Sequence, residues 1–273
     1  MKTAVVQMHV CDDKRANMAR AAGFVKQAAG RGAEVVVLPE MFNCPYQTKN
    51  FPVYAEKAGG ACWTALAETA RENAVYLIGG SMPEADDQGR VYNTSFVFGP
   101  DGGQIARHRK AHLFDIDVPG GQRFKESETL SAGTEITTFD TRFGTMGLLI
   151  CYDFRFPEMS RVMANRGAKV IFVPAAFNMT TGPAHWEILF RCRAQDYQVF
   201  TVGAAPARDE HGVYVSYANS IVVSPWGEVR LRLGTDEGVG LYDIDLAEVD
   251  RVRMQFPLRE HYKPGLYETQ SRL

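Results

Sequence analysis

The chain alternates twice between apolar, strand-like segments and helix-like segments, and each round ends in a hairpin. Each half follows the order strand, helix, strand, helix, strand, and then two short strands about a turn. The two turns are Gly99-Pro100-Asp101-Gly102-Gly103 and Pro225-Trp226-Gly227. Near-continuous apolar strands separated by helices are typical of sheets that helices cover. We therefore expect an α/β protein with a weak internal repeat, in which two sheets lie face to face with helices outside.

The expected elements follow from apolar periodicity and from glycine, proline and capping residues. Asp12 or Asp13 caps a first helix that buries Met18, Ala22, Val25 and Ala29 and ends at Gly32. The remaining helices are expected at 63–73, 157–166, 184–197 and 246–254. Strands are expected at 3–8, 34–38, 74–78, 93–98, 104–107, 146–150, 169–173, 199–203, 220–224, 228–233 and 238–244.

Two segments show no clear period. Residues 110–133 are polar, and a loop of that length in a compact domain is usually functional. The tail from about 257 to 273 is polar and contains proline, so we expect an arm that packs on a neighbouring subunit. With no linker-like composition break, the 273 residues predict a single domain over 1–273.

Charge and cysteine usage exclude several classes of function. The net charge of −2 gives no electrostatic reason to expect nucleic acid or a membrane surface as partner. No transmembrane run or signal peptide is recognisable. The five cysteines are scattered, without a CxxC pair, so neither a disulfide framework nor a structural zinc site is expected. These features favour a reduced, cytoplasmic enzyme.

Cys151 stands where an apolar strand gives way to a helix. Pro157 suits the first turn of that helix, and Glu158 suits its positive end. A cysteine at such a junction faces a cleft and can act as a nucleophile. Taken alone, however, Cys151 is equally consistent with a small buried hydrophobe.

Glu40 and Lys110 share this setting, because each follows a predicted strand. Parallel strands in one sheet would bring the three side chains to one edge, where clefts form. The combination indicates acyl transfer, in which Glu40 removes the thiol proton and the thiolate attacks a carbonyl carbon. Lys110 and the backbone N–H of Tyr152 would hold the oxyanion, and one such donor contributes about 10²–10³ in rate. Lys110 would also favour the thiolate. On spacing alone, both Glu40 and Lys110 could equally be solvated residues at strand ends.

Three motifs resemble the nitrilase superfamily of carbon–nitrogen hydrolases, and the resemblance extends over nearly the whole chain. They are Leu38-Pro39-Glu40, Arg109-Lys110-Ala111-His112-Leu113-Phe114-Asp115 and Cys151-Tyr152-Asp153-Phe154-Arg155-Phe156-Pro157-Glu158. Three stretches, 112–120, 177–186 and 223–228, further resemble the ω-amidase branch of that superfamily.

The resemblance implies an α-β-β-α sandwich, usually dimeric, without metal or organic cofactor. It implies that Glu40, Lys110 and Cys151 are catalytic, and that Glu126, in Phe124-Lys125-Glu126-Ser127, is a second glutamate. Such a carboxylate would orient Lys110 and the leaving ammonia. The implied reaction is hydrolysis of the terminal amide of short 2-oxo dicarboxylic acid monoamides, such as 2-oxoglutaramate and 2-oxosuccinamate.

Such a substrate carries a carboxylate at its far end, and Arg155 offers a guanidinium fork that matches it. Thr181 and Tyr46 could add hydrogen bonds, and Phe177 could form a wall of the pocket. A competing interpretation pairs Arg155 with Asp153 or Glu158 in a structural ion pair.

Other functions remain open from the sequence. The chain could belong to another branch of the superfamily: a nitrilase, an N-carbamoyl amidohydrolase or an amidase for deaminated glutathione. It could be a non-catalytic binding protein on the same fold, although Glu40, Lys110, Glu126 and Cys151 are all present. His108 and His112 could also bind zinc, but no third ligand is evident.

Overall fold

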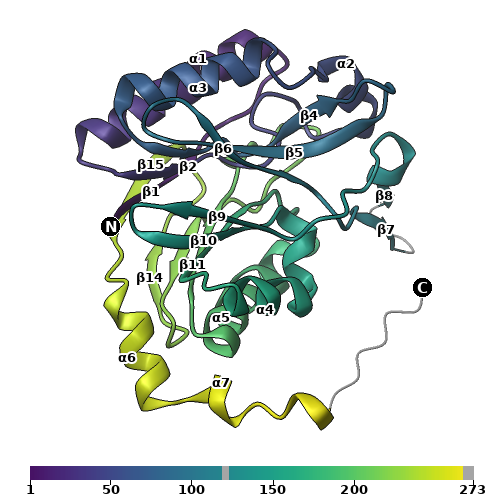
Figure 1. Ribbon diagram of the computed structural model, residues 1–273. Coiled ribbons are helices and arrows are strands. Elements are labelled where there is room, and N and C mark those ends of the chain that lie inside the picture. Colours follow the sequence, from purple (N-terminus) through teal and green to yellow (C-terminus); the bar gives the residue numbers. More distant parts are fainter. Residues whose placement is uncertain (119–122, 267–273) are drawn as a thin grey trace.

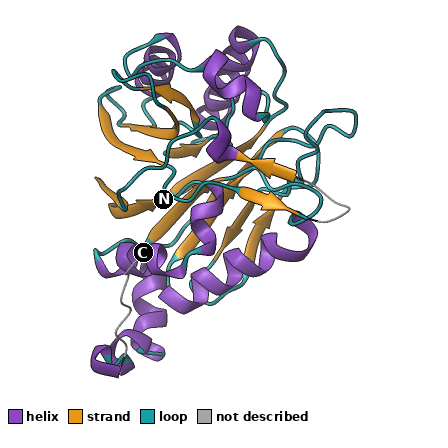
Figure 2. Cartoon of the chain, turned by 90° about the vertical axis from the view of Figure 1, so that its right-hand side faces the viewer, coloured by secondary structure: helices purple, strands orange, loops and turns teal. Residues whose placement is uncertain are grey.

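The computed structural model describes residues 1–118 and 123–266 and has four layers, helix, sheet, sheet and helix (Figure 1). The predicted fold class is therefore confirmed. Figure 2 shows the same layering from the side, with helices on the outer faces of the strands.

The first sheet has seven strands. Its parallel centre is β1 (Lys2–Gln7), β2 (Val35–Val37) and β3 (Tyr76–Ile78). The antiparallel flanks are β15 (Gly238–Asp243) on one side and β5 (Val91–Phe98), β4 (Met82–Ala85) and β6 (Gln104–Arg109) on the other. Because β15 pairs with β1, the second half of the chain completes the first sheet.

The second sheet has six strands and repeats this plan. Its parallel centre is β10 (Gly144–Leu148), β11 (Val170–Pro174) and β12 (Phe200–Ala204). Its antiparallel flanks are β9 (Thr137–Thr141), β13 (Ile221–Val223) and β14 (Val229–Arg232). The expected echo between the two halves is present.

The helices cover the outer faces, and the largest apolar layers lie on either side of each sheet. On the first sheet lie α1 (Lys14–Gly30) and α3 (Ala61–Asn73), and on the second lie α4 (Pro157–Asn165) and α5 (Gly182–Tyr197). Between the sheets, Val5, Val37 and Val97 pack in one layer with Phe172 and Phe200. The short helices are α2 (Phe51–Tyr54), α6 (Ala247–Gln255), α7 (Leu258–His261), η1 (Thr48–Asn50), η2 (Glu126–Glu128), η3 (Cys151–Arg155) and η4 (Pro264–Leu266).

The buried face of α1 is offset from the predicted one. Val25 is buried as expected, but the other fully packed positions are Asn17, Ala21 and Ala28. The apolar pattern missed Asn17 because this side chain is polar. It is buried because its amide exchanges hydrogen bonds with the backbone of Cys11.

The segment 110–133 contains regular structure, which corrects the prediction of a loop. Strands β7 (Asp115–Asp117) and β8 (Arg123–Lys125) pair antiparallel, and η2 follows. These strands have three residues each and carry charged side chains, so no apolar alternation announces them. Residues 119–122, like the end of the C-terminal arm at 267–273, lie outside the described part of the chain.

Glu40 and Lys110 follow strands of the first sheet, β2 and β6, whereas Cys151 follows β10 of the second sheet. The expectation that one sheet edge carries all three was therefore wrong. The groups meet where the ends of two facing sheets adjoin.

Over residues 1–118 and 123–266, no helix combines the length and the apolar character that crossing a membrane requires. All five cysteines are free thiols.

Candidate active site

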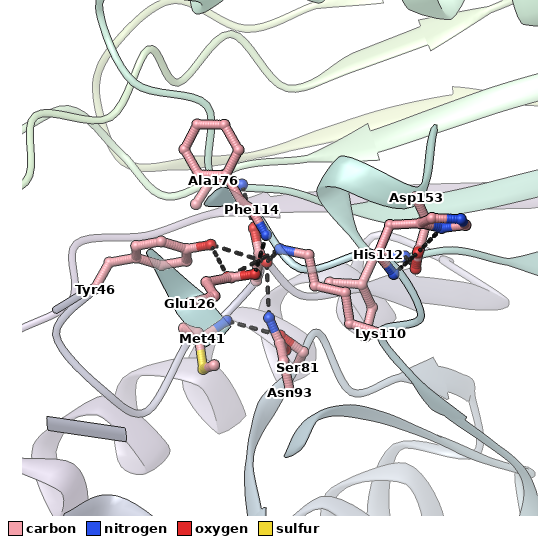
Figure 3. A network of polar contacts seen from close by, with 12 residues as sticks. Met41, Tyr46, Ser81, Asn93, Lys110, His112, Phe114, Glu126, Asp153 and Ala176 are labelled. Atoms are coloured by element: carbon pink, nitrogen blue, oxygen red, sulfur yellow. Dashed lines mark hydrogen bonds and ion pairs between the residues drawn. The ribbon is translucent and has the colours of Figure 1, made fainter. Parts of the chain in front are cut away.

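Lys110 lies at the centre of a buried charge cluster formed with Glu40 and Glu126, here called the Lys110 cluster. Its Nζ donates to Glu40 Oε1 at 2.9 Å and to Glu126 Oε1 at 2.9 Å (Figure 3). All three side chains are fully buried. Burial opposes the charged form of Lys110, but the carboxylates of Glu126 and Glu40 outweigh it and raise the pKa of Lys110. The amine is therefore an ammonium at neutral pH.

The two oxygens of Glu40 have different surroundings. Oε1 accepts from Lys110 Nζ and from Asn93 Nδ2 at 2.8 Å, and Tyr46 Oη lies 3.2 Å away. Oε2 accepts from the backbone N–H of Ala176 at 2.8 Å. The backbone of Ala176 also lowers the pKa of the Cys151 thiol, although burial outweighs this effect. Glu40 is close enough to Cys151 for its charge to raise the pKa of the thiol.

The turn that carries Glu40 has its own local requirements. Pro39 ends the strand, and the N–H of Met41 donates to Ser81 Oγ at 3.0 Å. Gly80 has a φ of +59°, and a Cβ there would lie 2.2 Å from the carbonyl oxygen of Pro39. Only glycine permits this approach of the two backbone segments.

Glu126 is held from three directions. Its Oε1 accepts from Lys110 and from Tyr46 Oη at 2.7 Å, and its Oε2 accepts from the N–H of Phe114 at 2.8 Å. Burial raises the pKa of Glu126, Lys110 lowers it, and Glu40 raises it, with a net upward direction. Tyr46 was expected to bind substrate. The structure places its hydroxyl between the two carboxylates of the Lys110 cluster, and a contact with substrate stays a prediction.

Cys151 occupies the first position of η3, directly after the strand β10, and its φ is +46°. A non-glycine residue in this left-handed region costs about 1–3 kcal/mol and is characteristic of functional turns. Burial raises the pKa of the thiol, Glu40 raises it further, and the opposing effect of Lys110 is smaller. Lys110 favours the thiolate, as expected, but burial and Glu40 outweigh it, so the resting group is a protonated thiol. Nucleophilic attack requires a base.

Two other predicted site residues, Tyr152 and Thr181, make no hydrogen bond with the Lys110 cluster within the described residues. Tyr152 follows Cys151, and its ring packs on Phe114 and Phe156 with centroids 5.2 and 5.6 Å away. The hydroxyl of Thr181 donates to Asn178 Oδ1 at 3.1 Å at the start of α5. The remaining predicted contact, from the N–H of Tyr152 to an oxyanion, stays a prediction.

Arg155 makes neither of the ion pairs considered above within the described residues. Its guanidinium lies 5.0 Å from the centre of the Phe177 ring, and Nη1 lies 3.2 Å from Nδ1 of His185. Burial lowers the pKa of Arg155, and the Cys151 thiol, which is close enough to act on it, raises it. Arg155 is thus a partly buried cation beside the nucleophile candidate, with Phe177 under its planar face.

A cavity of about 370 Å³ reaches Glu40, and Tyr46 and Tyr214 are among its lining residues. The other lining residues include Lys49 and Asp209, whereas Arg155, Phe177 and Thr181 are not among them. The cavity gives a small molecule or water a path to the Glu40 carboxylate.

His108 and His112 point at Asp153. His108 Nε2 lies 2.9 Å from Asp153 Oδ2, and His112 Nδ1 lies 2.9 Å from Asp153 Oδ1. Sequence reasoning considered Asp153 only as a partner for Arg155, and no local pattern relates it to histidines 41 and 45 residues away.

Comparison with known proteins identifies the family. The family model described as carbon-nitrogen hydrolase matches residues 2–254. The chain is 51% identical over 270 residues to omega-amidase NIT2 of Danio rerio, covering 99% of this chain and 97% of that protein. It is 48% identical over 271 residues to omega-amidase NIT2 of Homo sapiens, covering 99% and 98%. The crystal structure of Saccharomyces cerevisiae Nit3, a member of branch 10 of the nitrilase superfamily, matches with a TM-score of 0.88 at 39% identity, covering 94% of both chains. The buried Lys110 cluster therefore lies in a protein that belongs to the carbon–nitrogen hydrolase family.

Proposed function

We propose that the protein is an ω-amidase, which hydrolyses the terminal amide of short 2-oxo dicarboxylic acid monoamides such as 2-oxoglutaramate and 2-oxosuccinamate. The observation that carries the proposal is the Lys110 cluster beside the protonated thiol of Cys151. Together they supply a nucleophile, a base and a fixed cation in a buried site that a cavity reaches at Glu40. The near-50% identity to named omega-amidases over almost the entire chain supports this choice within the family.

In the first half of the reaction, Glu40 accepts the thiol proton through Oε2 while the sulfur attacks the amide carbon. The carbonyl oxygen becomes an oxyanion, which the Lys110 ammonium and the N–H of Tyr152 stabilise. Glu40 returns its proton to the amide nitrogen, the carbon–nitrogen bond breaks, and ammonia leaves a thioester on Cys151.

In the second half, Glu40 removes a proton from water that attacks the thioester. The carbon–sulfur bond breaks, the thiol regains a proton, and the acid is released. Glu126 orients Lys110 throughout, because its Oε1 accepts a second hydrogen bond from Nζ besides the one to Glu40 Oε1. No redox or organic cofactor takes part in this sequence.

The carboxylate at the far end of the substrate pairs with Arg155 in this proposal. A partly buried guanidinium that makes no ion pair within the described residues supports this role, because a carboxylate would satisfy it bidentately. Phe177 lies under the same guanidinium and would form the wall of that subsite, and Thr181 is a second candidate contact at the start of α5.

A cytoplasmic location and a homodimer complete the proposal. The five free thiols are consistent with a reducing compartment. Ile188 and Trp226 are 58% and 54% exposed and line one hollow on the surface of α5 and the β13–β14 turn. Exposed apolar side chains in one patch favour burial against another protein surface. Sedimentation of the natural protein and Ile188→Arg, at matched concentrations, tests whether that surface joins two copies.

The decisive experiment measures ammonia release from 2-oxoglutaramate by the natural protein, Cys151→Ala and Glu40→Gln. We expect release by the natural protein, no detectable release by Cys151→Ala, and a rate lower by about 10²–10⁴ in Glu40→Gln, because general-base catalysis contributes that much. Equal release by Cys151→Ala would contradict the nucleophile assignment. Release only from nitriles, carbamoyl amino acids or deaminated glutathione would assign the protein to another branch.

A further inference from the structure

One buried carboxylate outside the Lys110 cluster joins the two sheets. Asp153 lies in η3, and its Oδ1 accepts from the backbone N–H of Ala111 at 3.2 Å, the N–H of His112 at 2.8 Å and Nδ1 of His112 at 2.9 Å. Its Oδ2 faces Nε2 of His108 at 2.9 Å and the N–H of Ile150 at 3.3 Å. Five donors thus converge on one side chain.

These contacts are strong ones. Asp153 is completely buried, and burial raises the pKa of its carboxyl, but the hydrogen bonds from His108 and His112 outweigh burial and hold that pKa well below its usual range. The group is an anion at neutral pH. Hydrogen bonds to a buried charge are about twice as strong as neutral ones, and a donor that loses its acceptor there is left unsatisfied.

The donors that bind Asp153 lie next to Lys110 and Cys151 in the chain. His108 precedes Lys110 by two residues, and Ala111 and His112 follow it directly, so the bonds hold the chain on both sides of the lysine. Ile150 precedes Cys151, and Asp153 itself lies in the turn that Cys151 begins. Figure 3 shows His112 and Asp153 beside Lys110, on the side of the lysine away from Tyr46.

We propose that Asp153 is a positioning residue for the amidase reaction, which fixes the Lys110 segment of the first sheet against the Cys151 turn of the second, with His112 as the link that reaches the surface. The proposal rests on the function proposed above. Asp153 contacts neither Lys110 Nζ nor the thiol in this arrangement, so it acts through the backbone that places them.

His112 offers a clean test because its two contacts can be separated. Its ring stacks on Phe156 with centroids 3.6 Å apart, and its side chain is 34% exposed. His112→Phe keeps the stack and removes the Nδ1–H donor. His112→Asn removes the stack and places an amide N–H where Nδ1 was. If the bond to Asp153 matters, the Asn variant keeps activity and the Phe variant loses it.

The first measurement is kcat and KM for ammonia release from 2-oxoglutaramate. We expect His112→Phe to lower kcat by about 10-fold with KM within about 2-fold, because the lost bond affects oxyanion placement and not substrate binding. His112→Asn should stay within about 3-fold of the natural kcat. Equal kcat in all three proteins, or an equal fall in both variants, would overturn the proposal.

The second measurement needs no substrate. Iodoacetamide alkylation of Cys151, followed by peptide mass spectrometry across a pH series, reports the apparent pKa of the thiol, on which the charges of Glu40, Lys110 and Glu126 act. A loosened Lys110 stabilises the thiolate less, so His112→Phe should raise this pKa and slow alkylation at neutral pH. His112→Asn should leave it unchanged. An unshifted profile in His112→Phe would overturn the proposal even if 2-oxoglutaramate is not the substrate.

Asp153→Asn extends the test, with Asp140→Asn as its matched control. Asp140 is an exposed carboxylate on β9 whose bond to Thr145 Oγ1 lies within the second sheet. Asp153→Asn should lower kcat more than His112→Phe and shift the alkylation profile the same way, and Asp140→Asn should do neither. If Asp153→Asn does not fold, the two His112 variants decide. A folded Asp153→Asn with natural kcat would refute the positioning role of Asp153.

Discussion

Tyr46 shows what one hydroxyl contributes when two buried carboxylates adjoin it. Its oxygen lies 2.7 Å from Glu126 Oε1 and 3.2 Å from Glu40 Oε1, and its single proton can serve only one of them at a time. Burial, then the charges of Glu126 and Glu40, raise the pKa of Tyr46 well above its usual value. The hydroxyl therefore keeps its proton, and remains a donor, at neutral pH.

Tyr46→Phe should lower kcat by about 10-fold and destabilise the protein by about 1–3 kcal/mol, because a buried carboxylate oxygen loses a donor. The matched control is Tyr76→Phe, since that hydroxyl accepts from the backbone N–H of Arg142, away from the Lys110 cluster. Steady-state kinetics and urea unfolding check both. If Tyr46 instead binds substrate, as the sequence suggested, Tyr46→Phe would raise KM and leave stability unchanged.

Arg155→Met tests the predicted carboxylate contact. The variant keeps an unbranched apolar side chain and removes the cation, so KM for 2-oxoglutaramate should rise by about 10-fold or more, in line with the loss of a hydrogen-bonded charge pair. A neutral short amide should be affected far less. An equal effect on both substrates would show that Arg155 serves packing on Phe177 and not recognition.

Turns, more than strands, set the positions of the proposed catalytic side chains. Gly80 and Gly89 both have positive φ, +59° and +78°, but a Cβ at Gly80 would meet Pro39 whereas one at Gly89 would meet open space. Gly80→Ala should therefore lower stability by more than the backbone strain of about 1 kcal/mol and also lower kcat, since the clash displaces the Glu40 turn. Gly89→Ala should show the strain alone, with natural kcat. Thermal unfolding and kinetics distinguish the two, and similar behaviour of both variants would contradict the role given to Gly80.

The free energy of unfolding at acidic pH should depend on the ionisation of Asp153. The pKa of the Asp153 carboxyl is lowered in the folded protein. Its contribution to stability is therefore complete above its pKa in the unfolded chain, about 3.9, and is lost as the pH falls toward its pKa in the folded protein. The difference in unfolding free energy between the natural protein and Asp153→Asn should be constant above about pH 5 and shrink below about pH 4. Urea unfolding from pH 3 to 7 measures it, and a difference that grows on acidification would be incompatible with an ionised Asp153.

The sequence predicted those elements whose signal is local. The apolar run at 35–37 and the hairpin about Gly99 announce themselves through composition and turn residues. The strands β7 and β8 do not, because they are short and most of their residues are charged, as in the pair Asp115 and Lys125. Likewise β4 contains Pro83, which argues against a strand until its edge position is known.

The site was predicted residue by residue but not as an assembly. The motif implies Glu40, Lys110, Glu126 and Cys151, and the structure places the first three within hydrogen-bonding distance. Which sheet each strand joins depends on pairing between distant segments, so the sequence could not show that two sheets contribute. The hydrogen bonds of Asp153 with residues 108–112 depend on the same long-range packing.

We therefore expect the contact between the sheets to affect activity as well as stability. Phe172 is fully buried in the layer between them. Phe172→Ala should destabilise the protein by about 3–5 kcal/mol through the lost burial and the cavity it leaves. Where the variant is still folded, kcat should also fall, because the sheets repack. Phe256→Ala, at a residue that is 44% exposed, is the control for both measurements. A destabilised Phe172→Ala with natural kcat would show that activity does not depend on the packing between the two sheets.

The division of the site between the two sheets also defines where the polypeptide can be cut. Thr134 and Glu135 are exposed and lie outside regular structure. A break between them would leave Glu40, Lys110 and Glu126 on one fragment and Cys151 on the other, so neither piece alone would hold both base and nucleophile. Because β15 of the second fragment pairs with β1 of the first, the pieces retain a template for reassociation. Ammonia release from such a split protein would work as a complementation reporter, silent in each half and switched on by their encounter.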